Sequence, residues 1–428
     1  MLSKLKKLAS SDGALFTLSN LIFSFSTYLI ALAIPYKLDL KMMADFSATL
    51  NIVMILAFIF EFGLATSYLR FNQLYSTTRY INAYFQLFIF SILILFYSTF
   101  LGDYLIGSFG FENISLSHEY IYLSIFALLS WMFFKNVYLS NKNIKFIFVN
   151  AIILLLIRVG FLVYVFTQEQ LLSLDEIFLY FFILPFSLIS ILNIKYIFLY
   201  LKKSFQMIGE KRNIKIFTKR FKQLLIFSAL SYIINSLYIY TSRYAIVYLT
   251  EHNMTETLAE LGYAFSFGGL IMVFMVSMRL YFISKFNISD IDAIIEYVKK
   301  IGHYKFHFIV VAFLFSLLIS YIVSIIKPDY LTIRSIYFLF IIIFSYAIIA
   351  YYSMFTLLSK TFDFNKLELA LNIVRLILVV VVAHFFMQSS PVLGFGLISI
   401  AIILIEYIFA KIVLRKVLRK EINNAKTD

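Results

Sequence analysis

Cysteine is absent from this 428-residue sequence, and proline and glycine are scarce, with 4 and 13 residues. Without cysteine the chain can form neither disulfides nor thiolate metal sites. So few prolines and glycines exclude collagen-like and low-complexity classes. Charged residues are also rare, at 14%, whereas 62% of the residues are hydrophobic and 50 are phenylalanine. A water-soluble protein could not bury that much apolar surface, so the composition predicts a membrane protein.

Long apolar runs follow one another along the whole chain. Lipid offers the backbone no hydrogen-bond partners, so each run of about 20 apolar residues predicts a transmembrane helix. The expected fold is all-α and polytopic. Twelve helices are predicted, at 14–35, 47–69, 81–101, 120–139, 146–166, 177–199, 224–249, 261–283, 306–326, 335–358, 367–387 and 391–414.

Positive charge is placed unevenly along this pattern. Most of the 37 Lys and Arg residues fall in connections that share one side of the membrane with both chain ends. Basic residues mark the cytoplasmic side, so both termini are expected to be cytoplasmic. The net charge of +14 is then an orientation signal that also attracts anionic phospholipids, and nucleic acid is not an expected partner.

The longest inner connection is basic and divides the helices six and six. It predicts an N-terminal lobe at 1–201, a connecting loop at 202–223, and a C-terminal lobe with a basic tail at 224–428. Many transporters consist of two related halves with the substrate pathway between them. We therefore expect two six-helix lobes around a central cavity, in a monomeric protein.

Several ionisable side chains fall within the predicted spans, where burial in lipid is costly unless they face water or a partner. Cations outnumber acids at depth, and a guanidinium binds phosphate or carboxylate through two parallel hydrogen bonds. The pattern therefore predicts a cationic cavity for an anionic substrate. The arginines placed in it by this argument are Arg158, Arg243, Arg279 and Arg375.

Other interpretations of the same residues stay open. Arg158 and Arg375 could form static ion pairs with Glu61 and Glu406, and Arg279 could extend to the membrane surface, as could Lys195.

Helix-breaking residues also fall within the spans. Pro185 removes a helix hydrogen bond, which makes it either a hinge or a static kink. Gly268 and Gly269, and likewise Gly394 and Gly396, are expected to serve close helix packing.

Signatures of enzymes are missing from the sequence. It contains no GxxxxGK[ST] or HExxH motif, and the predicted outer loops are too short to form a folded platform. The sequence thus predicts a transporter with no catalytic residue, cofactor or metal.

Three segments resemble polysaccharide transporters, a family within the multidrug/oligosaccharidyl-lipid/polysaccharide flippase (MOP) superfamily, which also contains multidrug and toxic compound extrusion (MATE) proteins. The first segment, FEFGLATSYLRF at 60–71, is similar to the acidic-Phe-Gly-Leu stretch and basic residue that end the family's second helix. The second, SRYAIVYLTEHNMTETLAELGYAFSF at 242–267, resembles the family's connection into the eighth helix. The third, PVLGFGLISIAIILIEYIFA at 391–410, is similar to the glycine-rich opening of a late helix.

The resemblance implies roles for Glu61, Arg70 and Arg243, and it implies a flippase in the bacterial inner membrane. The expected substrate is an undecaprenyl-pyrophosphate-linked oligosaccharide of O-antigen, lipopolysaccharide or capsular polysaccharide biosynthesis. Transport would proceed by alternating access and draw on an Na⁺ or H⁺ gradient, with Glu61 and Glu406 as candidate ion-coupling residues. Association with glycan polymerase machinery is a further option. The alternatives are a multidrug or cation antiporter of the same fold and a membrane-embedded glycan polymerase or ligase.

Overall fold

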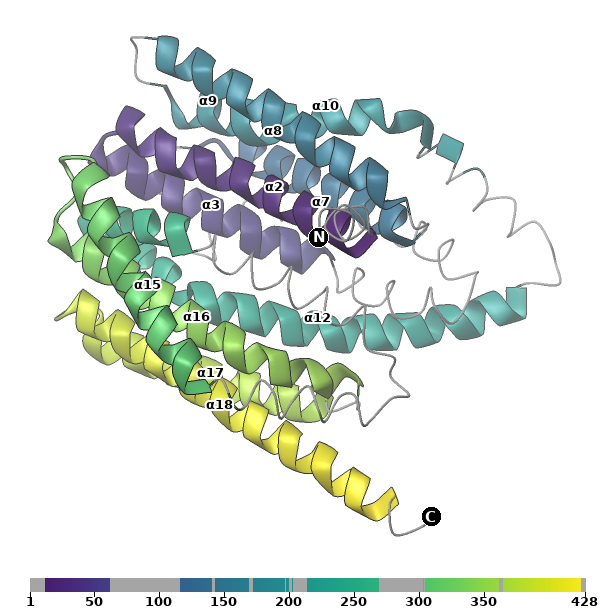
Figure 1. Cartoon of the computed structure of the whole chain (residues 1–428). Helices are drawn as coiled ribbons and strands as arrows, with labels where there is room; N and C mark the ends of the chain where they lie inside the picture. The colour runs from purple at the N-terminus through teal and green to yellow at the C-terminus, as the bar shows by residue number, and fades with distance from the viewer. Residues whose placement is uncertain are drawn as a thin grey trace, which may run out of the picture. The chain divides into compact units, whose positions relative to one another are not determined.

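The chain is represented by a computed structural model that describes residues 12–61, 116–140, 143–168, 172–196, 198–199, 202, 214–268, 303, 305–361 and 365–424. Every regular element within these residues is helical (Figure 1). Seven helical segments of this part are long and apolar enough to cross a membrane. The predicted all-α, polytopic fold class is therefore confirmed.

The helices follow the order of the predicted spans. Residues 255–268 also form a helix, which is named here by its residue range. The labelled elements are α2 (Asp12–Ala33), η1 (Ile34–Lys37), α3 (Leu40–Glu61), α7 (His118–Ser140), α8 (Ile144–Thr167), α9 (Leu174–Phe178), η2 (Leu179–Ile183), α10 (Leu184–Leu192), α12 (Ile214–Glu251), α15 (Lys305–Ile326), α16 (Ile333–Thr361), α17 (Asn365–Phe386) and α18 (Pro391–Asn424).

The largest differences from the predicted spans lie at helix ends. α12 begins at Ile214 within the basic connection, and α18 continues to Asn424, beyond the apolar run that ends near 414. A helix satisfies its own backbone, so it does not need to stop where the hydrocarbon stops. α3 begins at Leu40, ahead of the apolar run. The Asp39 carboxylate accepts a hydrogen bond from the Met42 amide at 2.7 Å, which satisfies one of the free donors at this helix start.

The chain divides into two compact units. Unit 1 comprises Met1–Ala44 and Thr241–Asp428, and unit 2 comprises Asp45–Tyr240. Within unit 1, α16 packs against α15 and α18, and α17 packs against α18 (Figure 1). Within unit 2, α7, α8 and α10 pack against one another. The lobe boundaries expected at 201 and 224 stay a prediction.

The core of unit 1 is aromatic and depends on one close helix approach. The ring of Phe395 meets those of Phe265 and Phe338 edge to face, with centroids 5.8 Å and 5.7 Å apart. At Gly268, a Cβ would lie 1.9 Å from Ile342 Cγ2. Only glycine allows the helix at 255–268 to approach α16 this closely, so at Gly268 the packing interpretation fits the structure.

The core of unit 2 is aromatic as well. Phe178 packs against Phe46 and stacks on Phe182, with centroids 5.9 Å and 5.1 Å apart. A reciprocal capping box starts α9: the Glu176 amide donates to Ser173 Oγ at 3.3 Å, and the Ser173 amide donates to Glu176 Oε2 at 2.8 Å. This cap fixes the start of the segment that carries Pro185.

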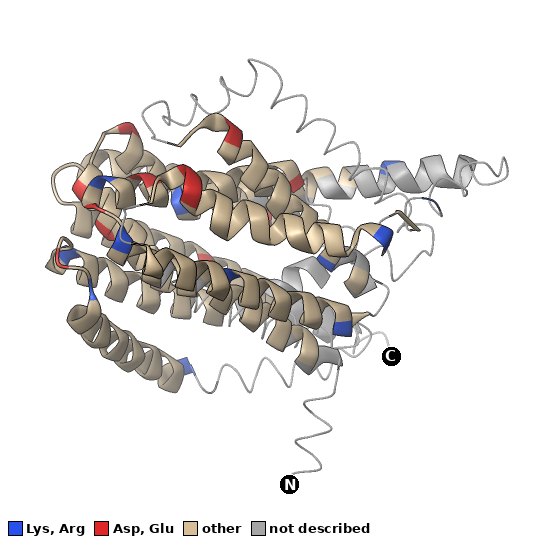
Figure 2. Ribbon diagram, turned by 90° about the horizontal axis from the view of Figure 1, so that it is seen from above, with Lys and Arg blue, Asp and Glu red and all other residues tan. Residues whose placement is uncertain are grey.

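Charged residues lie mostly toward the ends of the described helices, whose middles are drawn almost entirely in tan (Figure 2). Apolar side chains on α15 are widely exposed instead, a surface that suits lipid rather than water. The large exposed ones include Phe306, Val310, Phe313, Leu314, Leu317 and Tyr321.

Candidate functional site

Arg158 of α8 is almost fully buried, at 1% exposed. Its Nε donates a hydrogen bond to the Phe181 carbonyl oxygen at 3.0 Å. Its guanidinium carbon lies 5.0 Å from the centroid of the Phe186 ring and 5.7 Å from that of Phe182. Aromatic faces and a carbonyl oxygen both attract a cation, so this pocket stabilises the charge of Arg158 inside unit 2. The alternative pairing with Glu61 stays a prediction.

Pro185 explains why that carbonyl is available. In a regular α-helix the Phe181 carbonyl would accept the amide hydrogen of residue 185, but proline has none. The preceding turn, η2, is a single π-helical turn, and the Leu184 amide bonds to the Leu179 carbonyl. Such widened turns relieve the clash between a proline ring and the carbonyl four residues earlier. Pro185 therefore lies at a real irregularity, and whether it is a hinge stays a prediction.

Arg375 of α17 and Glu406 of α18 form a buried ion pair. The side chains are 3% and 6% exposed, and Arg375 Nη2 donates to Glu406 Oε1. Breaking such a pair leaves an uncompensated charge away from water. The structure thus contains the ion pair that the sequence left open as an alternative for these two residues.

Arg243 of α12 differs from Arg158 and Arg375 because it is only partly buried. Its guanidinium carbon lies 5.2 Å from the centroid of the Phe265 ring, and Tyr346 of α16 is close enough to interact with its charge. A cation on an aromatic face keeps its charge. Of Arg158, Arg243 and Arg375, Arg243 is the most exposed, and its contact with a solute stays a prediction.

Glu61, at the end of α3, is buried and lies near Lys135 of α7, which is close enough for electrostatic attraction. The run predicted at 120–139 forms the helix α7, and its Lys135 faces the Glu61 carboxylate within unit 2. The remaining predicted site residues are less informative. Arg70 and Arg279 lie outside the described residues, and Lys195 is exposed.

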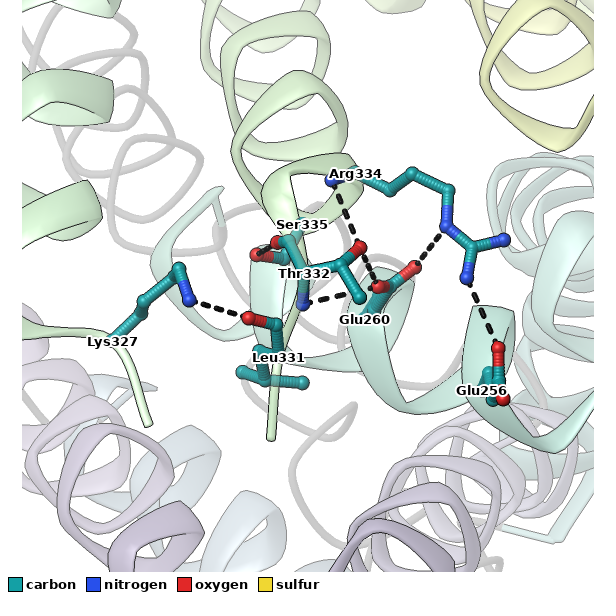
Figure 3. A network of polar contacts seen from close by, with 7 residues as sticks. All are labelled: Glu256, Glu260, Lys327, Leu331, Thr332, Arg334 and Ser335. Carbon is teal, nitrogen blue, oxygen red and sulfur yellow. Dashed lines mark hydrogen bonds and ion pairs between the residues drawn. The ribbon is translucent and has the colours of Figure 1, made fainter. Parts of the chain in front are cut away.

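A further buried carboxylate, Glu260, did not stand out from the sequence. It is 1% exposed and accepts hydrogen bonds from the Thr332 amide, at 3.2 Å, and from the Thr332 hydroxyl. Arg334 Nε lies 3.1 Å from Glu260 Oε2, and Arg334 Nη2 lies 3.1 Å from Glu256 Oε2 (Figure 3). The only sequence signal was the spacing of the two acids, which places them one helical turn apart.

This network joins the helix at 255–268 to the connection between α15 and α16. The same connection is hydrogen-bonded to η1: the Tyr330 hydroxyl donates to the Pro35 carbonyl oxygen at 2.8 Å. Burial raises the pKa of the Tyr330 hydroxyl, and the nearby Asp39 adds to the effect. Because the pKa moves further above neutrality, Tyr330 stays protonated and remains a donor at physiological pH.

The buried acids of the described residues share one feature, which is a basic side chain close to the carboxylate. Glu61, Glu260 and Glu406 are the carboxylates buried there, and each faces a basic side chain, namely Lys135, Arg334 and Arg375. A carboxylate that holds a tethered cation in a poorly hydrated place is a site where a proton or metal cation can compete for the same oxygen atoms.

The sequence and the structure were compared with those of known proteins. No protein-family profile and no curated protein sequence matches the chain. Among solved structures, a multidrug resistance MATE family transporter of the MOP superfamily in an outward-facing conformation superimposes with a TM-score of 0.53 at 14% identity, over 98% of both chains. A eukaryotic MATE transporter gives 0.52 at 12% identity, over 98% of both chains. A Vibrio cholerae MATE transporter in a bent form gives 0.50 at 13% identity, over 96% of this chain and 98% of the other.

These likenesses show that the chain has the fold of MATE transporters of the MOP superfamily. All three neighbours are described as MATE transporters, and the outward-facing one as a member of the MOP superfamily, the superfamily to which the sequence resemblance points.

Proposed function

We propose that this protein is an ion-coupled antiporter of the multidrug or cation type, and that it exports an organic solute by alternating access. The fold supports this, because a multidrug resistance MATE transporter matches over 98% of the chain. The observation that carries the proposal is that every buried carboxylate of the described residues has a basic side chain close to it. Glu260 and Glu406 form ion pairs, and Lys135 lies close enough to Glu61 for electrostatic attraction. An ion-coupled antiporter needs carboxylates that can exchange one bound cation for another, here a basic side chain for the coupling ion.

The exchange step follows from these pairs. Glu406 is neutralised by Arg375, and Glu61 is attracted to Lys135. Binding of H⁺ or Na⁺ to either carboxylate weakens its hold on the basic partner, which then becomes available to other groups. Each pair thus has two states, one closed on itself and one holding the coupling ion. Such a two-state element links ion binding to movement of the solute.

Transport in proteoliposomes tests the proposal. The full chain is reconstituted, a pH or Na⁺ gradient is imposed, and movement of ethidium is followed by fluorescence. Gradient-driven ethidium transport is expected, and it should be lost in the double variant Glu61→Gln, Glu406→Gln while membrane insertion is retained. Lys145→Gln, at an exposed position, is the control and should transport normally. Transport by the double variant at the wild-type rate would contradict the coupling role.

A second candidate is the flippase for undecaprenyl-pyrophosphate-linked oligosaccharides that the sequence resemblance implies. The partly buried Arg243 on the Phe265 ring favours it, because a guanidinium beside aromatic faces suits a pyrophosphate attached to sugars. This reading places the protein in the bacterial inner membrane with cytoplasmic termini, alone or beside glycan polymerase machinery.

One assay separates the two candidates. A fluorescent polyprenyl-pyrophosphate-linked oligosaccharide is incorporated into the same proteoliposomes, and dithionite reports how much of it reaches the outer leaflet. A flippase accelerates this exchange, and Arg243→Ala abolishes it. An antiporter leaves the exchange at the protein-free rate while ethidium moves.

A further inference from the structure

Two lysines of unit 1 meet at one tyrosine ring. Lys305 Nζ, at the start of α15, lies 5.4 Å from the ring centroid of Tyr407 and 5.9 Å from that of Tyr352. Lys411 Nζ lies 5.6 Å from the same Tyr407 ring. Both distances to Tyr407 are within the range of a cation–π interaction. We define these four residues, Lys305, Tyr352, Tyr407 and Lys411, as the lysine–tyrosine cluster.

The tyrosines of this cluster are firmly held. The ring centroids of Tyr352 and Tyr407 lie 5.5 Å apart in an edge-to-face contact. Tyr352 packs against a buried hydrophobic cluster formed by Tyr351, Phe355 and Ala410. Both lysine ammonium groups are therefore drawn toward one fixed aromatic surface between α15, α16 and α18.

Within the part of the chain that the structure describes, no acid balances the charge of the cluster. Among the described residues, neither Lys305 nor Lys411 forms an ion pair with a carboxylate, and both side chains are exposed. Two like charges beside one ring repel each other, and the aromatic face offsets this only in part. An anion bound by both ammonium groups would remove the repulsion.

The position of the cluster indicates which anion. Lys305 opens the membrane-spanning segment Lys305–Ile326, and Lys411 lies near the end of the segment Pro391–Lys416. Both lysines thus lie where a helix leaves the hydrocarbon, at the depth of lipid headgroups, and tyrosine favours the same depth. Directly beyond Lys305, α15 exposes Phe306, Val310 and Phe313, a surface suited to acyl chains.

We propose that the lysine–tyrosine cluster binds the phosphate of an anionic phospholipid, whose acyl chains lie along the exposed apolar side of α15. The sequence predicts this membrane face to be cytoplasmic, so the lipid would come from the inner leaflet. The binding does not depend on which solute the protein transports.

Lipid-dependent stabilisation of the purified full chain tests the proposal. The protein in a neutral detergent is titrated with phosphatidylglycerol, and its thermal unfolding is followed. Loss of one ammonium group that contacts the lipid phosphate should weaken binding by roughly a factor of five. The double variant Lys305→Gln, Lys411→Gln should therefore bind phosphatidylglycerol roughly 25-fold more weakly than the wild type. Phosphatidylcholine and inorganic phosphate should stabilise neither protein.

Matched variants distinguish binding at the lysine–tyrosine cluster from general attraction between basic side chains and the lipid. Lys145→Gln with Lys202→Gln removes two exposed lysines on the same predicted side of the membrane, and should leave lipid binding unchanged. Tyr407→Leu should weaken binding, whereas Tyr407→Phe should retain it, because the ring face is kept. Equal losses in the two double variants, or unaltered binding in Lys305→Gln, Lys411→Gln, would overturn the proposal. Stabilisation by inorganic phosphate alone would assign the cluster to a soluble anion and would overturn it too.

Discussion

Arg158 of α8 donates its Nε hydrogen to the Phe181 carbonyl, at a distance of 3.0 Å. In a regular helix this carbonyl would bond to the amide of residue 185, which is proline here. The arginine side chain thus replaces a backbone donor that the sequence removes. The Phe182 and Phe186 rings also face the guanidinium. Arg158 therefore supplies a hydrogen bond that the helix lacks at Pro185, and the same segment stabilises the buried charge of Arg158.

We predict that Arg158 and Pro185 are energetically coupled. Arg158→Ala should lower the free energy of unfolding, since it removes a buried side chain and the donor to Phe181. Pro185→Ala restores an amide hydrogen, so it should recover about 1 kcal/mol of the loss in the double variant. Thermal or chemical unfolding of all four proteins measures this coupling. Pro391→Ala, at the first turn of α18, is the control and should be additive with Arg158→Ala.

The relation between Arg158 and Pro185 also shows how far the sequence could lead. The apolar runs predicted the helices because lipid requires backbone bonds to close within a segment, and the same rule identified the ionisable residues at depth. The pattern could not tell which partner each buried charge has. Arg375 pairs with a carboxylate, whereas Arg158 contacts a carbonyl oxygen and two aromatic rings. This difference depends on how the side chains of neighbouring helices pack in space, which the pattern of apolar runs does not encode. Glu260 was missed because its partners are distant in the sequence: Thr332 lies in the connection before α16, and Arg334 lies in the first turn of α16.

Gly268 should tolerate no larger side chain. Its absent Cβ would lie 1.9 Å from Ile342 Cγ2, so Gly268→Ala forces the helix at 255–268 away from α16 and should cost about 1–3 kcal/mol. Ile342→Ala removes that atom, and the double variant should be less destabilised than the sum of the two single variants. At Gly396 the closest atom to a Cβ is Ile341 Cδ1 at 3.8 Å, an ordinary contact, so Gly396→Ala is expected to be neutral or slightly stabilising. Equal melting temperatures for Gly268→Ala and the wild type would argue against this packing.

The two acids that contact Arg334 should differ sharply in importance. Glu256 has a side chain that is 70% exposed, so its ion pair should contribute at most about 1 kcal/mol. Glu260 is buried and also accepts two hydrogen bonds from Thr332, so Glu260→Ala should cost about 1–3 kcal/mol. Unfolding in 0.05 M and 1 M NaCl separates the contributions, because salt screens the exposed pair more strongly. Similar losses for both variants would mean that burial does not set the strength of this network.

Arg375 and Glu406 allow stability and ion coupling to be measured separately. Each single variant, Arg375→Met or Glu406→Met, leaves one buried charge without its partner and should destabilise unit 1 by about 3–5 kcal/mol. The double variant replaces the pair by apolar side chains of similar volume and should regain most of that stability. If Glu406 carries the coupling ion, this well-folded double variant must still lose gradient-driven ethidium transport, because it lacks the carboxylate that binds the ion. Retained transport at restored stability would show that the pair only holds the helices together, and would leave Glu61 as the candidate for coupling.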